Sequence, residues 1–278
     1  MKDLESRTVL VTGASDGLGR GVARALAARG AELLVHGRDA ARTEAVAGEL
    51  RAHGAAAVRV YLADLASLAE VRRLAAEVRA REPRLHVLVN NAGIGTTVPT
   101  SARAESADGI ELRFAVNYLS HYLLTRELLP LLRASAPARI VNVSSIGQTA
   151  IDFDDPMLTR GYSGMRAYCQ SKLAQIMFTI DLAAELAGTS VTVNALHPAT
   201  YMPTKIVAHP TSTLAEGVDA TVRLVTDPAL AATTGKFFDG TRESNADRQA
   251  YDPAAREKLR ALSARLVGVG ASGHTRPG

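Results

Sequence analysis

The stretch that most constrains the fold is a short apolar run followed by a glycine-rich turn and a helical pattern. Thr8–Val11 is rich in β-branched and aliphatic residues and is expected to form a buried strand. It leads into Thr12–Gly19, where three glycines have the spacing Gly-x-x-x-Gly-x-Gly, and the helical pattern continues to Arg29. Glycine permits positive φ and close backbone approach, and helix N-terminal amides face anions. The combination predicts a phosphate site, whereas the glycines alone would also fit a plain turn.

The alternation of strand and helix continues along the chain. Further strands are expected at 31–36, 56–62, 85–89, 139–143, 190–196 and 236–238, and helices at 39–52, 67–81, 110–133, 166–186, 214–226 and 253–267. This spacing predicts a parallel sheet wound right-handedly, with ligands at the carboxyl ends of the strands. We therefore expect a single-domain α/β Rossmann fold over 1–267, doubly wound, with about seven parallel strands and helices on both faces. Residues 268–278 are expected to form a flexible tail.

Composition excludes several classes of protein. The chain has 278 residues, of which 47% are hydrophobic and 22% charged, so a large core is expected and global disorder is not. The net charge of +4 is spread over many arginines, which favours a mixed surface over nucleic-acid binding. Cys169 is the single cysteine, so an internal disulfide is excluded. The sequence shows no signal peptide and no transmembrane run, so we expect a cytoplasmic protein without a membrane partner.

The residues after the second expected strand bear on the choice of cofactor. In dinucleotide-binding folds an acidic residue here binds the adenosine ribose, whereas an arginine accommodates a 2′-phosphate. Gly37 stands at the usual place of the acid, with Arg38 beside it and Asp39 next. This favours NADP(H) over NAD(H). A solvated Arg38 at the start of a helix is the alternative, and Asp39 is the residue that could reverse the preference.

The pair Tyr168-x-x-x-Lys172 lies within an expected helix. Residues four apart share a helix face, so the phenol and the ammonium are expected to project the same way. A cation favours the phenolate and brings the tyrosine pKa, ordinarily about 10, nearer to neutral. Such a pair suits proton transfer to or from a substrate oxygen. Alone the motif is weak, because a solvated helix face gives the same spacing.

Other polar or small residues follow the ends of the expected strands. Asn90–Gly93 follows the fourth strand, where small residues let a flat ring approach and the amides can brace neighbouring strands. Ser145 follows the fifth strand. Asn117 on the 110–133 helix would on its own be read as a structural hydrogen bonder. Ser67 is expected to cap a helix, with Glu70 as its capping-box partner.

These motifs occur in the order of a known family. The chain resembles the short-chain dehydrogenases/reductases over about 6–267, on Thr12-Gly13-x-x-x-Gly17-x-Gly19, Asp64, Asn90-Asn91-Ala92-Gly93, Asn117, Ser145 and Tyr168-x-x-x-Lys172. The segments 139–145 and 167–174, with the long spacing from the serine to the tyrosine, look most like the retinol-dehydrogenase-like and WW-domain-oxidoreductase-like branch.

The resemblance implies a catalytic tetrad. Tyr168 would be the general acid in carbonyl reduction and the base in alcohol oxidation. Lys172 would lower the Tyr168 pKa and bind the nicotinamide ribose, Ser145 would hold the substrate oxygen, and Asn117 would position a water that links Lys172 to solvent. The implied product is an alcohol made from a ketone or aldehyde with NADPH, or the reverse.

The resemblance also implies a set of cofactor contacts. The pyrophosphate and ribose would be lined by Gly13, Ser15, Asp16, Gly17, Leu18 and Gly19. Arg38 would meet the 2′-phosphate, and the adenine would lie against Asp64 and Leu65. The adenosine and inner ribose would follow Asn91, Ala92 and Gly93. Besides Tyr168 and Lys172, the nicotinamide would be bordered by Pro198 and Thr200.

Several points stay open at this level. The family often has Pro-Gly where this chain has Pro198-Ala199, and Pro203 stands where a threonine is usual. Substrate loops are expected at about 96–101, 146–166 and 201–213, the last as a mobile segment. Membrane members of the branch begin with a hydrophobic anchor that this sequence does not show, so a retinoid substrate is not carried over.

Two other functions fit the same fold. One is a non-catalytic NADP(H)-binding regulator, but such proteins commonly lose the tyrosine or the lysine, and this chain keeps both. The other is an isomerase or lyase, and the short C-terminal part argues against its larger sugar-nucleotide type. Homodimers or homotetramers through the Asn117 and Tyr168 helices, or a monomer, all fit the resemblance.

Overall fold

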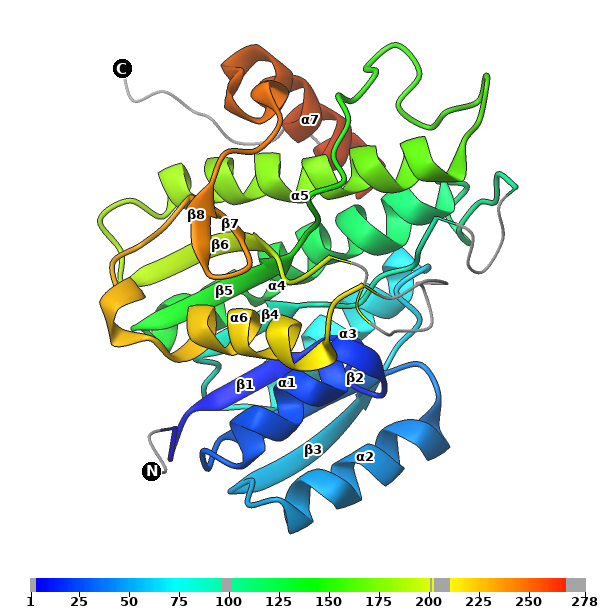
Figure 1. Ribbon diagram of the computed structural model, residues 1–278. Coiled ribbons are helices and arrows are strands. Elements are labelled where there is room, and N and C mark those ends of the chain that lie inside the picture. The colour runs from blue at the N-terminus through cyan, green and yellow to red at the C-terminus, as the bar shows by residue number, and fades with distance from the viewer. Residues whose placement is uncertain (1–3, 97–101, 201, 203–210, 269–278) are drawn as a thin grey trace, which may run out of the picture.

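A sheet of eight strands lies at the centre of the molecule, in the order β3-β2-β1-β4-β5-β6-β7-β8 (Figure 1). The computed structural model describes residues 4–96, 102–200, 202 and 211–268. In chain order the strands are β1 (Thr8–Val11), β2 (Glu32–Gly37), β3 (Ala57–Leu62), β4 (Val87–Asn90), β5 (Ala138–Val143), β6 (Val191–His197), β7 (Phe237–Asp239) and β8 (Arg242–Ser244). The direction of winding reverses between β1 and β4, where a doubly wound sheet binds its ligand.

The first seven strands pair in parallel, which confirms the predicted Rossmann fold. The eighth strand was not predicted. It runs antiparallel to β7 and returns through a turn in which Gly240 has a φ of +56°. Its three residues are polar and partly or fully exposed, so they carry none of the apolar alternation by which a strand is recognised.

Helices cover both faces of the sheet (Figure 1). One face packs against α3 (Leu68–Arg81), α4 (Ser120–Ala134), α5 (Gly164–Glu185) and α7 (Pro253–Leu266), and the other against α1 (Gly17–Ala27), α2 (Ala40–Ala52) and α6 (Leu214–Thr226). Alternate strand residues serve the two layers: Leu10 and Leu88 point to the first, and Val9 and Val89 to the second. The described chain also contains two short 3₁₀ turns, η2 (Pro228–Leu230) and η3 (Arg248–Tyr251).

The predicted helix over 110–133 is divided in the structure. It opens with a π-helical turn, η1 (Phe114–Leu119), before α4 begins. Such turns insert one extra residue and are frequent at functional sites; this one contains Asn117. Pro130 lies inside α4, in its last turns, and the helix continues to Ala134.

The expected capping box at the start of α3 is only half formed. Ser67 Oγ accepts from the Glu70 N–H at 3.4 Å, as predicted. The Glu70 carboxylate does not complete the box, because it pairs with Arg73 at 2.6 Å. A complete capping box instead begins α6, between Thr213 and Glu216.

Helix α7 lies along α5 (Figure 1). Asp181 of α5 pairs with Arg256 and Arg260 of α7, each at 2.7 Å. The Tyr118 and Ser263 hydroxyls are 2.6 Å apart, which ties α7 to η1 as well. In the described part of the chain no helix combines the length and the apolar run needed to cross a membrane.

Candidate active site

The glycine turn between β1 and α1 packs backbone against backbone. Gly13 has a φ of +64°, and a Cβ on Gly19 would lie 2.3 Å from the Gly13 carbonyl oxygen, so both positions require glycine. Asp16 caps α1 by accepting from the Gly17 N–H at 2.8 Å. A helix N-terminus beside a turn with so few side chains is a ready site for an anionic phosphate.

Short polar side chains hold this turn to the neighbouring strand. Thr12 Oγ1 accepts from the N–H groups of Asn91 and Ala92 at 2.9 and 3.0 Å. Asn91 Nδ2 donates to the Thr12 carbonyl at 2.8 Å, and Asn90 Nδ2 donates to Asn142 Oδ1 of β5 at 2.8 Å. The prediction that these amides brace neighbouring strands is confirmed.

His36 supports the turn from β2, a role that was not predicted from the sequence. Its Nδ1 accepts from the Gly13 N–H at 3.2 Å, and its Nε2 lies 3.1 Å from the Ala63 carbonyl. Burial lowers the pKa of His36 to about 4, so the ring is neutral at pH 7, with the proton on Nε2 facing that carbonyl. Within an apolar strand, His36 resembles an ordinary core residue. Only its position near the carboxyl end of β2 indicates that it lies close to the ligand edge of the sheet.

The end of β2 has no room for an acidic side chain at position 37. A Cβ on Gly37 would lie 2.2 Å from Thr43 Oγ1. Asp39 is engaged as the N-cap of α2, accepting from the Arg42 N–H at 2.9 Å. Arg38 is exposed, and no ion pair joins it to another described residue.

A hollow of about 310 Å³ adjoins the glycine turn on this side. Its walls are Ser15, Asp16, Arg20, Arg42, Ala45, Val46 and Glu49. Arg42 bonds Asp16 at 2.8 Å across it. Arg38 is not among the wall residues, and the two cations of the wall, Arg20 and Arg42, are paired with Glu49 and Asp16.

The predicted adenine and turn contacts differ in what their side chains do. Asp64 is exposed and accepts from the Ala66 N–H at 3.0 Å. Leu18 and Leu65 are buried in the two hydrophobic layers, so their side chains serve the core. Their contacts with a cofactor stay predictions.

Ser145 and Tyr168 face one small space. A Cβ on Gly147 would lie 3.4 Å from Ser145 Oγ and 4.0 Å from Tyr168 Cε1. Ser145 lies just beyond β5 and accepts from the Gly147 N–H at 3.0 Å, whereas Tyr168 is one turn into α5 and partly exposed. The serine hydroxyl and one edge of the phenol ring, which come from two elements, therefore both lie near Gly147, beyond the carboxyl end of β5.

Lys172 lies beneath Tyr168, with its Nζ 5.7 Å from the centre of the phenol ring. The ammonium donates to the Val143 carbonyl at 2.9 Å and to Gln175 Oε1 at 3.0 Å, and an ammonium has a third proton for another acceptor. A Cβ on Gly93 would lie 3.7 Å from Nζ, so this glycine keeps the approach open. Burial lowers the pKa of Lys172 to about 7.

Asn117 uses its side chain to hold the chain after β4. Its Oδ1 accepts from the Ile94 N–H at 2.8 Å, and its Nδ2 donates to the Ile94 carbonyl at 3.2 Å and to Ser171 Oγ at 3.1 Å. This is the structural hydrogen-bonding role that a buried asparagine suggests. The water-positioning role implied by the family stays a prediction.

Gln175 and His121 extend the hydrogen bonds of Lys172, and neither residue was predicted from the sequence. Gln175 accepts from Lys172 through Oε1, and its Nε2 lies 3.0 Å from His121 Nδ1. Burial first, and then Lys172, lower the pKa of His121 to about 3, so it is neutral and accepts from Gln175. Both sit among apolar residues of α4 and α5; the three-residue spacing from Lys172 to Gln175 was the only signal.

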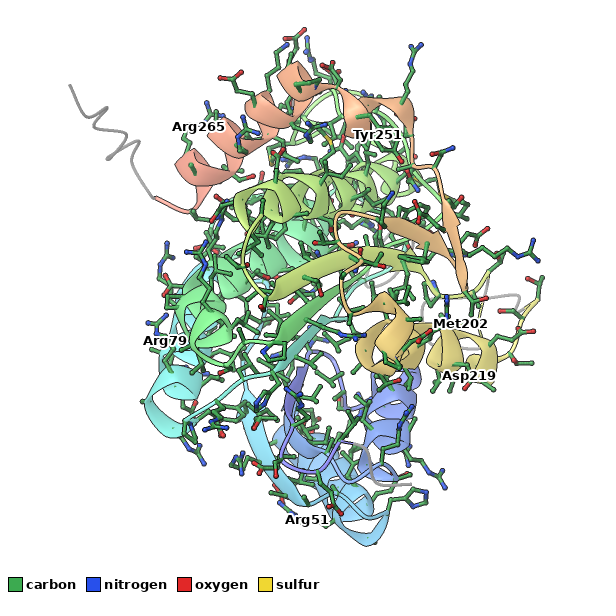
Figure 2. The ribbon with its side chains drawn as sticks, turned by 90° about the vertical axis from the view of Figure 1, so that its left-hand side faces the viewer. Arg51, Arg79, Met202, Asp219, Tyr251 and Arg265 are labelled. Atoms are coloured by element: carbon green, nitrogen blue, oxygen red, sulfur yellow. The ribbon has the colours of Figure 1, made fainter. Side chains whose placement is uncertain are left out.

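Pro198 and Thr200 follow β6. Thr200 Oγ1 lies 3.0 Å from His197 Nε2. They line a hollow of about 790 Å³ between α6 and the β7–β8 hairpin, whose walls include none of the four predicted catalytic residues. Met202 packs against Gly217 of α6, on the side of the molecule that also carries Asp219 (Figure 2).

Parts of the expected substrate loops lie outside the described residues, namely 97–101, 201 and 203–210, with Pro203 among them, and so does 269–278 of the predicted tail. Among the residues that the structure describes, no group of three or more His, Cys, Asp or Glu side chains could hold a metal ion.

Known proteins resemble this chain over most of its length. The family model for short chain dehydrogenases matches residues 7–214. Human retinol dehydrogenase 13 is 40% identical to this chain, in an alignment that covers 96% of this chain and 86% of that protein. Mouse retinol dehydrogenase 14 is 38% identical, in an alignment that covers 96% of this chain and 87% of that protein. The Pseudomonas aeruginosa RhlG/NADP active-site complex superposes with a TM-score of 0.69 and 30% identity, covering 86% of this chain and 96% of the other.

Proposed function

This chain belongs to the short-chain dehydrogenase family and is similar to its retinol dehydrogenases, and from that premise we propose that it is an NADP(H)-dependent oxidoreductase. It reduces a ketone or aldehyde to an alcohol, or runs the reverse reaction. The observation that carries the proposal is the small space shared by Ser145 and Tyr168, with the Lys172 ammonium beside the phenol.

The chemistry assigns a role to each of the three side chains. When bound, the nicotinamide supplies or accepts the hydride. Hydride arrival builds negative charge on the carbonyl oxygen, and in this proposal the Ser145 and Tyr168 hydroxyls donate to that oxygen. Tyr168 then gives its proton to that oxygen. Lys172 favours the phenolate left behind, and in alcohol oxidation Tyr168 takes the proton back.

The glycine turn fits a dinucleotide. Gly13 and Gly19 let the turn pack closely against Asn91 and Ala92, and α1 begins at Gly17, so the N-terminal amides of that helix can face a pyrophosphate. A Cβ at position 37 would lie 2.2 Å from Thr43 Oγ1, and one oxygen of Asp39 is used to cap α2, so both positions are poorly suited to an acid that binds ribose hydroxyls. With Arg38 exposed and Arg42 nearby, these features support NADP(H) over NAD(H). RhlG, a similar structure, is an NADP complex.

The substrate is proposed only as a class. Ile146 and Met165, 48% and 55% exposed, flank Ser145 and Tyr168 along the chain. Large apolar side chains exposed beside the reacting groups favour a medium or large, partly apolar carbonyl compound.

An oligomer formed through η1 and α5 stays a prediction. Helix α7 of the same chain already covers part of that surface. A cytoplasmic location stays a prediction as well.

Tyr168→Phe tests the proposal with little disturbance of packing. Turnover of NADPH with a panel of ketones and aldehydes should fall by about 10²- to 10⁴-fold, since that is the usual contribution of a general acid. NADPH binding, followed by its fluorescence, should stay close to that of the wild type. Full turnover in the variant would show that another group supplies the proton. Tyr162 is a poor rival, because burial and then Glu111 raise its pKa to about 12.

A further inference from the structure

Arg113 is a fully buried arginine near the site, and the proposed reaction assigns it no role. Arg113 and Glu111, just before η1, are both 0% exposed. Buried charges are costly unless they are paired and hydrogen-bonded, and a long apolar side chain would fill the same volume without that cost. The contacts of this pair therefore indicate what it does.

The guanidinium joins two segments that are far apart in the sequence. Arg113 Nε donates to the Gly95 carbonyl at 2.8 Å and Nη2 to the Thr96 carbonyl at 2.7 Å. Its Nη1 donates to the Tyr162 hydroxyl at 2.7 Å. The planar guanidinium thus hydrogen-bonds the segment after β4 on one side and the segment before α5 on the other.

Glu111 completes the group and supplies the opposite charge. Its Oε1 accepts from the Tyr162 hydroxyl at 3.0 Å and lies 3.8 Å from Arg113 Nη1. Its Oε2 accepts from the Phe114 N–H at 2.7 Å, which fixes the carboxylate to the start of η1. We call Glu111, Arg113 and Tyr162 the Arg113 clamp.

The backbone at the two gripped segments is in direct contact. A Cβ on Gly164 would lie 2.2 Å from the Thr96 carbonyl oxygen and 3.4 Å from Arg113 Nη2. Only glycine permits this approach, and it occurs at the first residue of α5. The same arrangement is supported from further along, where Arg103 Nε donates to the Met157 carbonyl at 3.1 Å.

Both gripped segments lead within a few residues to the tetrad. Thr96 follows Ile94, which Asn117 holds by two hydrogen bonds. Gly164 lies one helical turn before Tyr168. We propose that the Arg113 clamp positions Tyr168 against the Asn117 side of the site and fixes the Gly95–Thr96 wall beside it, so that Glu111, Arg113 and Tyr162 are positioning residues for proton transfer. The inference rests on the proposed function for its kinetic part.

The first test uses a variant that leaves no buried charge unpaired. Glu111→Gln with Arg113→Met removes both charges and keeps the volume, and it should lower kcat by about tenfold to a hundredfold, since small misplacements of reacting groups have effects of that size. The dissociation constant of NADPH should change less than twofold. Tyr162→Phe, which keeps the ring and loses only the bridging hydroxyl, should lower kcat in the same direction but less.

Arg139→Met is the matched control. Arg139 also donates to two backbone carbonyls, those of Leu224 and Asp227 at 3.0 and 2.9 Å, but it lies at the amino end of β5, away from the site. This variant should lose stability with kcat unchanged. An equal loss of kcat in Arg139→Met, or wild-type kcat in both clamp variants, would overturn the proposal.

Hydrogen exchange separates this proposal from the proposed function. With NADPH absent, backbone amides in 91–96 and 162–168 should exchange faster in both clamp variants than in the wild type and in Arg139→Met. If the wild type reduces no carbonyl compound, the proposed function fails, and the exchange rates alone decide on the clamp. If those rates match the wild type, the clamp is wrong whatever the activity.

Discussion

The glycine turn and the catalytic helix meet at the same edge of the sheet but are built from different groups. Neutral groups hold the turn: the Thr12 hydroxyl, the Asn91 amide and a His36 ring whose pKa burial has lowered to about 4. Buried ionisable groups hold the catalytic side: Lys172 beneath Tyr168, and the pair of Arg113 and Glu111.

The difference has a physical reason. A turn that receives a phosphate uses backbone amides, so it needs small neutral residues and no buried cation of its own. A site that moves a proton needs a charge held close to the proton donor, and burial makes that charge sensitive to its partners. We therefore expect pH and single substitutions to act most strongly on the catalytic side.

Lys172→Met is expected to give the largest effect that follows from this difference. Turnover should fall by about 10²- to 10⁴-fold, because the phenol loses the cation that adjusts its acidity. At low pH the free energy of unfolding of the variant should instead be higher than that of the wild type, because the variant no longer buries an ammonium. Burial lowers the pKa of Lys172 to about 7, whereas a lysine in the unfolded chain has a pKa of about 10.4.

The sign of the pH dependence follows from these two values. Between them the unfolded chain binds more protons than the folded chain, so the free energy of unfolding of the wild type rises with pH. The advantage of Lys172→Met should be greatest at pH 6 and should shrink above pH 7 by up to about 1.4 kcal/mol per pH unit. Urea unfolding of both proteins at pH 6 and pH 9 measures it. If the stability advantage of Lys172→Met over the wild type grew with pH, the lowered pKa of a buried Lys172 would be wrong.

Arg38→Ala sharpens the comparison from the cofactor side, with a smaller effect. If the exposed arginine meets the 2′-phosphate, NADPH binding should weaken by roughly 10- to 100-fold, the usual range for a charge-assisted hydrogen bond. NADH binding should change little. Arg42→Ala is the companion variant, because Arg42 lines the hollow beside the turn. Equal losses for both cofactors would show that the arginines do not distinguish them.

The parts of the molecule that the sequence predicts well share one property: their signal is local. β1 and the glycine turn follow from a run of neighbouring residues, and the seven parallel strands follow from repetition of the strand–helix unit. Tyr168 and Lys172 lie on one face of α5, as their helical spacing predicts. In each case the residues that specify the feature lie within a few positions of one another.

The features that were missed depend on partners far along the chain. Arg113 acquires its role only when Tyr162, 49 residues later, comes into contact with it. His121 and Gln175 are 54 residues apart and look like helix residues of the core until they pair. The antiparallel β8 was missed for another reason, because three polar residues form a strand only through the hairpin that returns them to β7.

The central claim is that hydride passes from a bound nicotinamide to a carbonyl carbon while Tyr168 supplies the proton. The most direct measurement uses NADPH carrying deuterium at C4 on each face in turn, with a ketone that the wild type reduces, and mass analysis of the alcohol. One of the two labelled cofactors should place one deuterium on the carbinol carbon, and Tyr168→Phe should slow that transfer by at least about a hundredfold. An alcohol free of deuterium with both labels, or transfer unaffected by the substitution, would contradict the account.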